Sequence, residues 1–117
     1  MTDKTANFLP LSPATLHILL ALAGEDLHGY GIMQEVARQS DNRYKLGPGT
    51  LYDNLQRLMK QRMVEEVTGP REEGTSRRRY YRLSPLGRGV LSQEIARLQD
   101  VVHEGRMRLR SFKPRRA

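Results

Sequence analysis

A polar, cation-rich stretch near the middle of the chain has the residue types of a nucleic-acid contact. The 3.6-residue period of a helix that starts at Pro48 brings several small, polar and basic residues to one face. These are Gly49, Thr50, Asp53, Gln56, Arg57 and Lys60, with Tyr52 and Asn54 on the flanks. Guanidinium and ammonium groups pair with phosphates, which favours an anionic partner. An ordinary solvated helix face is the alternative, because most exposed Lys and Arg residues do nothing specific.

The net charge favours the same class of partner. The 117 residues include 20 Lys and Arg against 13 Asp and Glu, a formal charge of +7. This balance suits nucleic acid or an acidic membrane surface, and charge alone does not choose between them. The length fits one small domain and excludes a large multidomain enzyme.

The chain offers little for catalysis or metal binding. It has no Cys, which excludes disulfides and thiolate ligands, and its three histidines, His17, His28 and His103, have no carboxylate or thiol at ligand spacing. The glycine cluster at 29–31 lacks the third glycine of a dinucleotide fingerprint, and the cluster at 47–49 lacks the lysine of a phosphate loop. We therefore expect no enzyme, no metal and no cofactor.

No segment of the sequence is suited to crossing a membrane. The longest apolar run, 18–23, is far shorter than the roughly 20 residues of a spanning helix. Asp3 and Lys4 precede only a short apolar pair, unlike a signal peptide. We expect a soluble, cytoplasmic protein without a membrane partner.

Three helices and a hairpin are expected to position the cation-rich face. The apolar spacing predicts helices over 13–24 and 29–39 and a third from Pro48. A short strand is a further expectation at 44–46. Strands over 63–68 and 79–83 flank a Gly- and Pro-rich tip. In the second of these strands, Tyr81 and Leu83 share the face expected to cover the core.

A final helix is predicted over 85–105, followed by a basic tail over 106–117. Its apolar stripe consists of Val90, Leu91, Ile95, Leu98, Val101 and Val102. Such a stripe needs another helix to cover it. We expect a second copy of the chain to supply that helix, so that these residues form a two-fold interface.

The order of elements is that of a winged helix-turn-helix domain. We expect a mostly α fold with a small β-hairpin wing and a C-terminal dimerisation helix. A helix about 10–12 Å across fits a major groove roughly 12 Å wide, and the hairpin tip can reach an adjacent backbone. The chain then divides into a flexible arm at 1–11, a DNA-binding domain at 12–84, the dimerisation helix at 85–105 and the tail at 106–117.

Three motifs in this order resemble the PadR-like transcriptional regulators. They are the apolar run 18–22 followed by Leu27-His28-Gly29-Tyr30-Gly31-Ile32, the run Pro48-Gly49-Thr50-Leu51-Tyr52 with Leu55, Arg57 and Leu58, and the run Arg78-Arg79-Tyr80-Tyr81-Arg82-Leu83-Ser84 with Gly87. The match covers residues 13–98. The resemblance implies a dimeric winged-helix DNA-binding protein, usually a repressor, of the small subfamily with one helix after the wing.

The resemblance also bears on individual residues. It implies that Thr50 and Tyr52 meet DNA instead of only starting and packing the helix, and it supports the same role for Gln56, Arg57 and Lys60. Tyr30 and Lys45 are further candidates for phosphate contact, with a core aromatic and an ordinary surface cation as the alternatives.

The wing contributes two more candidates, Arg77 and Arg78. Because successive side chains of a strand alternate between its faces, at most two of the three arginines 77–79 share the DNA side.

Two function classes remain open. The leading hypothesis is a homodimeric repressor that binds a near-palindromic operator in double-stranded DNA through two helices about 34 Å apart. Relief by a small-molecule effector is an added expectation. The alternative is a small RNA- or ribosome-binding basic module, for which the net charge is equally suitable, although few aromatic residues are present for base stacking.

Overall fold

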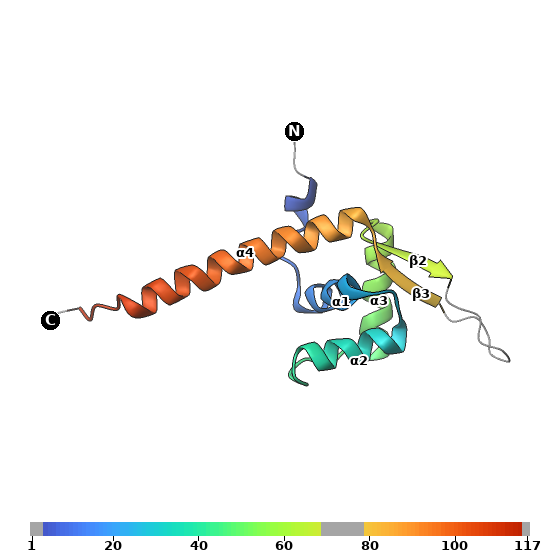
Figure 1. Cartoon of the computed structure of the whole chain (residues 1–117), viewed down its shortest axis with the longest axis horizontal. Coiled ribbons are helices and arrows are strands. Elements are labelled where there is room, and N and C mark those ends of the chain that lie inside the picture. The colour runs from blue at the N-terminus through green and yellow to red at the C-terminus, as the bar shows by residue number, and fades with distance from the viewer. Residues whose placement is uncertain (1–3, 69–78, 116–117) are drawn as a thin grey trace.

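The chain folds into a helical body from which one long helix projects (Figure 1). The computed structural model describes residues 4–68 and 79–115. In chain order the elements are the 3₁₀ helix η1 (Lys4–Phe8), α1 (Pro13–Gly24), β1 (Leu27–His28), α2 (Gly29–Gln39), α3 (Pro48–Lys60), β2 (Val64–Thr68), β3 (Arg79–Leu83) and α4 (Pro85–Arg110). The predicted helices and the two strands of the wing are confirmed, and the fold is a mostly α winged helix-turn-helix.

Side-chain caps fix where three of the helices begin. Ser12 Oγ and Ser84 Oγ each accept a hydrogen bond from the backbone N–H three residues further on, and a proline occupies the first turn that follows. At α2 the cap is His28, whose Nδ1 accepts from the N–H of Gly31 at 3.0 Å. Gly47 before α3 provides no side-chain cap. Pro48 in the first turn is therefore the feature that favours the start of α3 at this point.

The sheet contains a strand that the sequence did not indicate. Its order is β1-β3-β2, all antiparallel, with Leu27 opposite Tyr81. The strand predicted at 44–46 is wrong. Ser40 Oγ accepts from the Tyr44 N–H and donates to the Tyr44 carbonyl, both at 3.0 Å, and the Tyr44 ring stacks on His17 at 4.7 Å between centroids. A backbone held in this local turn offers no edge for a sheet.

The core lies between α1, α2, α3, the sheet and the first turns of α4. In β3, Tyr81 and Leu83 face it, as predicted. Val90 and Leu91 of α4 are also part of it, at 0% and 5% exposure. Their predicted place in a two-fold interface is therefore wrong, because the body of the same chain covers them.

Gly87 allows this close packing of α4. A Cβ at this position would lie 2.1 Å from the carbonyl oxygen of Met63. Without a side chain there, α4 lies directly against the backbone that joins α3 to the wing. The next turn of α4, which carries Val90 and Leu91, is consequently inside the body.

α4 continues beyond its predicted end. It runs through Gly105 to Arg110, so residues 106–110 are helical and do not belong to a tail. Arg108 Nε lies 2.8 Å from Glu104 Oε1, and cations in a last turn suit the negative end of the helix dipole. The radius of gyration of 17.9 Å exceeds the roughly 13 Å of a compact chain of this length, because this part of α4 projects past the body (Figure 1). Within residues 4–68 and 79–115, no helix combines the length and apolarity needed to span a bilayer.

The N-terminal segment is docked instead of forming the predicted flexible arm. Residues Lys4–Phe8 form η1 beside α4, and Phe8 and Leu9 pack on the core. The Leu11 N–H donates to Glu94 Oε2 at 2.7 Å, and the buried Glu94 also pairs with Arg97. The Arg97 guanidinium and the Leu11 N–H together hold the pKa of the Glu94 carboxyl below its ordinary value. Glu94 thus anchors the N-terminal segment to α4.

Candidate nucleic-acid interface

α3 has one buried and one exposed face. Leu51, Leu55 and Leu58 point into the core. The outer face holds the polar and basic residues predicted for it, and all of them are exposed: Thr50, Tyr52, Asp53, Gln56, Arg57 and Lys60. The candidate contact residues of α3 therefore lie together on one accessible surface.

One flank of this surface is a hydrogen-bonded cluster that joins α3 to α1. Asn54 is only 7% exposed. Its Nδ2 donates to the Thr50 carbonyl at 2.8 Å, and its Oδ1 accepts from Thr15 Oγ1 at 3.3 Å and from Arg57 Nη2 at 2.5 Å. The same Arg57 nitrogen lies 3.4 Å from Thr15 Oγ1. Arg57 therefore has one nitrogen anchored while its side chain stays exposed.

The other flank opens into a cleft toward the wing. Its volume is about 480 Å³, and it is lined by His28, Gly29, Tyr30, Tyr52, Arg79 and Tyr81. A Cβ on Gly29 would lie 2.3 Å from the Tyr52 hydroxyl oxygen, so a glycine is needed for Tyr52 to lie against the start of α2. Tyr30 is 63% exposed and is not a core aromatic. Burial raises the pKa of the Tyr81 hydroxyl.

Besides Tyr30, three residues predicted to contact DNA lie outside α3: Lys45, Arg77 and Arg78. Lys45 is exposed on the segment that leads into α3, which agrees with a surface role. Arg77 and Arg78 fall outside the residues that the structure describes.

The two described arginines of β3 are engaged in ion pairs. Arg79 Nε lies 3.3 Å from Glu66 Oε1. Arg82 donates from Nε and Nη2 to the two carboxylate oxygens of Asp26, at 2.9 and 2.7 Å. The Arg82 guanidinium also holds the pKa of Asp26 below its ordinary value. β3 therefore presents less unpaired positive charge than its sequence indicates.

Sequence reasoning missed the role of Thr15 and placed Asn54 only on a flank. The available signal was helical position. Thr15 precedes the buried Ile18 by one turn, and Asn54 lies one turn from both Leu51 and Leu58. A polar residue on an inward stripe requires hydrogen-bond partners, and here the two residues partly satisfy each other.

Two of the three histidines, His17 and His28, have structural partners. His28 caps α2, and His17 Nδ1 lies 3.2 Å from Gln39 Nε2. Across the described parts of the chain, no group of three or more His, Cys, Asp and Glu side chains could hold a metal ion.

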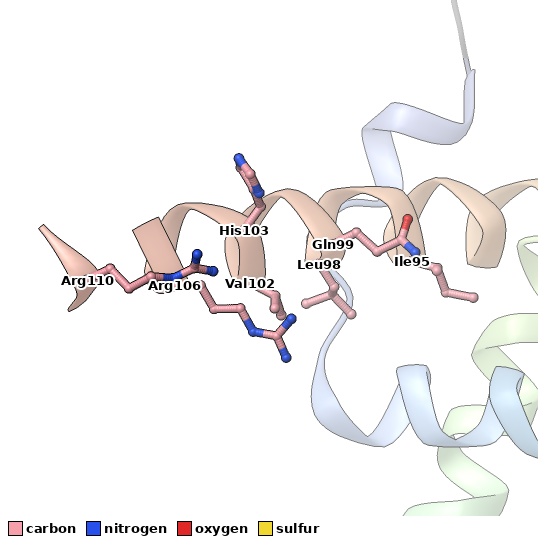
Figure 2. A pocket seen from close by; sticks show the side chains of 7 residues that line it. All are labelled: Ile95, Leu98, Gln99, Val102, His103, Arg106 and Arg110. Atoms are coloured by element: carbon pink, nitrogen blue, oxygen red, sulfur yellow. The ribbon is translucent and has the colours of Figure 1, made fainter. Parts of the chain in front are cut away.

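A second accessible surface lies along the projecting half of α4. A groove of about 450 Å³ there is lined by Ile95, Leu98, Gln99, Val102, His103, Arg106 and Arg110, and Figure 2 shows these side chains along the helix. Of the residues predicted for a two-fold interface, Ile95, Val101 and Val102 are exposed and Leu98 is half-buried. The body of the chain therefore covers these apolar side chains only in part.

Comparison with known proteins relates this architecture to a family. The family described as "Transcriptional regulator PadR-like family" matches residues 18–93, more than half of the chain. The "Transcriptional regulator Rv3488" of Mycobacterium tuberculosis is 35% identical over 89 residues, which cover 76% of this chain and 78% of that protein.

Solved structures agree on the fold. A PadR family transcription regulator from Clostridium difficile has a TM-score of 0.67 at 23% identity, covering 84% of this chain and 99% of that chain. Bacillus subtilis PadR, solved in complex with operator DNA, has a TM-score of 0.64 at 19% identity, covering 74% of this chain and 48% of that chain. Family match, relative and fold agree: the chain belongs to the PadR-like family of transcriptional regulators, which are not enzymes.

Proposed function

We propose that this protein binds specific sequences of double-stranded DNA and inserts α3 into the major groove. The observation that carries the proposal is the outer face of α3, where every polar and basic side chain is exposed while the opposite face is buried. A helix held in this way can enter a groove roughly 12 Å wide without disturbing the core. Operator binding by Bacillus subtilis PadR, which has the same fold, supports the proposal.

The contacts divide between the centre and the flanks of α3. In the centre, Gln56 and Asp53 can hydrogen-bond base edges, since an amide pairs with adenine and a carboxylate accepts from the cytosine amine. On the flanks and nearby, we assign phosphate contacts to the following residues: Tyr30, Lys45, Thr50, Tyr52, Arg57 and Lys60, together with Arg77 and Arg78 of the wing. Phosphate contacts of this kind fix the register of a protein on the duplex.

We further propose a cytoplasmic homodimer. Ile95, Val101 and Val102 of α4 are exposed and Leu98 is half-buried, and a two-fold partner would bury all four against their own copies. Two such chains would present their α3 helices to successive major grooves, about 34 Å apart. The operator is then a near-palindrome.

In this proposal the dimer acts as a repressor that a small molecule can release. The groove on α4 has about 450 Å³, within the range of 300–1,000 Å³ common for ligand sites. Because Ile95, Leu98 and Val102 line this groove and also belong to the proposed dimer contact, a molecule bound there would enter that contact and change the spacing of the two α3 helices.

Selection of duplexes from a random DNA pool by the purified protein tests the proposal. We expect a near-palindromic consensus. In the Lys60→Gln variant, affinity for this consensus should fall about 3–10-fold, and the slope of log affinity against log salt should become less steep by about 0.9. The matched variant Arg88→Gln removes the same charge from an exposed position on α4 and should leave both quantities unchanged. Equal competition by A-form RNA at the same salt concentration would contradict the proposal and favour the RNA-binding alternative.

A further inference from the structure

We propose that Asn54 is a positioning residue for DNA binding, which holds the Arg57 guanidinium on the flank of α3 so that its free donors meet a backbone phosphate. The inference rests on the proposed function and goes beyond it. It assigns a role to a buried residue that does not itself reach the DNA. The evidence is the cluster of Asn54, Arg57 and Thr15.

Asn54 is an energetically unfavourable residue type for its position. It lies on the inward side of α3 beside the buried Leu51 and Leu58, and it is itself 7% exposed. Burial of an amide is unfavourable unless its donors and acceptor are all paired, and a small apolar side chain would avoid that cost. A polar group here therefore calls for an explanation other than packing.

Hydrogen bonds determine the orientation of the Asn54 amide. Its Nδ2 donates to the Thr50 carbonyl one turn back along α3, at 2.8 Å, which turns Oδ1 toward α1. There Oδ1 accepts from Thr15 Oγ1 and from Arg57 Nη2. With the amide reversed, its NH₂ group would meet the guanidinium donor to donor. The Thr50 carbonyl thus fixes the oxygen that anchors Arg57.

Several N–H donors of the Arg57 guanidinium remain without a hydrogen bond in the described part of the chain. Its guanidinium has five N–H donors, and in the described part of the chain only Nη2 forms hydrogen bonds, to Asn54 and Thr15. Nε and Nη1 remain available on an exposed side chain. A long side chain that is already held in one geometry loses less conformational entropy when a phosphate binds. Asn54 therefore acts on DNA affinity through Arg57.

A double-mutant cycle tests this coupling on the selected duplex over a range of salt concentrations. We expect Arg57→Ala to lower the affinity about 10-fold and to reduce the magnitude of the salt slope by about 0.9. Asn54→Ala alone should lower the affinity about 3–10-fold and also flatten the slope, because Arg57 loses its anchor. In the Arg57→Ala background, the same Asn54→Ala change should alter the affinity by less than about 2-fold.

Two further variants keep the test decisive. Valine has nearly the same shape as threonine, so Thr15→Val removes only the hydroxyl that contacts both Asn54 and Arg57. This variant replaces Asn54→Ala in the test if Asn54→Ala does not fold. It should weaken binding about 2–3-fold, and only when Arg57 is present. Gln56→Ala is the matched control on the exposed face outside the cluster, and its effect should be the same in both Arg57 backgrounds.

The outcomes separate this inference from the proposed function. A purely structural role for Asn54 predicts equal losses of affinity with and without Arg57, together with an unchanged salt slope. Such a result would overturn the inference, as would an Arg57→Ala variant that binds like the parent. Either result leaves the proposed function intact as long as the parent selects a duplex sequence. A parent protein that selects none contradicts the proposed function itself.

Discussion

In the first half of α4, Val90, Leu91 and Glu94 are enclosed by the body of the chain, whereas in the second half Val101 and Val102 are exposed. Both halves carry the same apolar spacing. Steps of four and three connect Leu91 to the half-buried Leu98 and, after Gly105, continue to the exposed Leu109 and Phe112. The comparison teaches that a periodic apolar stripe indicates a helix face that needs cover, but not whether its own chain or another one supplies that cover.

The largest expected difference between the halves concerns stability. Leu91→Ala should lower the free energy of unfolding by about 2–5 kcal/mol, because it leaves a cavity in the core. Leu109→Ala, the same change at an exposed position, should alter it by less than about 0.5 kcal/mol at protein concentrations too low for self-association. Urea denaturation followed by circular dichroism measures both values. Equal losses at the two positions would show that the halves do not differ.

A smaller effect is expected on association. Val102→Asp places a charge in the middle of the exposed stripe, and we expect it to raise the dimer dissociation constant by at least about 100-fold, because burying an unpaired carboxylate costs several kcal/mol. Met107→Asp adds the same charge on another side of α4 and should change the constant by less than about 3-fold. Sedimentation equilibrium gives both constants. A parent chain that is monomeric at micromolar concentration would remove the proposed interface altogether.

The smallest effect is a difference in pH dependence between two acidic residues of α4, Glu94 and Glu104. The folded-state pKa of Glu94 is lowered from an ordinary value of 4.5. Its ionised form therefore stabilises the fold above about pH 4.5, and this contribution is lost as the pH falls through the lowered pKa. Glu94→Gln should cost about 1–2 kcal/mol near pH 7 and progressively less in acid.

Glu104→Gln is the matched control, because Glu104 and Arg108 form an exposed pair in the projecting half. We expect a cost below about 0.5 kcal/mol at every pH. Unfolding of both variants by urea at about pH 7 and about pH 3.5 supplies the comparison. If the cost of Glu94→Gln were the same at both pH values, the stabilising role of its ionised form would be refuted.

The sequence predicted most of the fold because the main signals are local. Ser12, Ser84 and the prolines after them mark helix starts, and the inward leucines of α3 mark its buried face. What could not be predicted depends on contacts between distant segments. The pairing of Leu27 with Tyr81 makes β1 a strand, and the Met63 carbonyl beneath Gly87 brings Val90 and Leu91 into the core.

The same difference between local signals and long-range contacts applies to the candidate site. The exposed face of α3 could be derived from a period of 3.6 residues along one helix. The contribution of Thr15 to the anchoring of Arg57 could not, since Thr15 of α1 lies 39 positions from its partner Asn54 of α3. The pairing of Arg82 with Asp26 was equally invisible, because a turn and a strand 56 residues apart meet there.

The junction between α3, the wing and α4 has a mechanical consequence. The Ser84 hydroxyl donates to the Arg62 carbonyl at 2.6 Å, the Ser84 N–H donates to the Met63 carbonyl at 3.0 Å, and Gly87 rests on that same carbonyl. These contacts hold the first turn of α4 against the residues that directly follow α3, whereas the C-terminal part of α4 projects from the body (Figure 1). As a rigid helix, α4 can therefore tilt only about its contact with Met63. Any tilt imposed on the far end must either break these bonds or move α3 along with it.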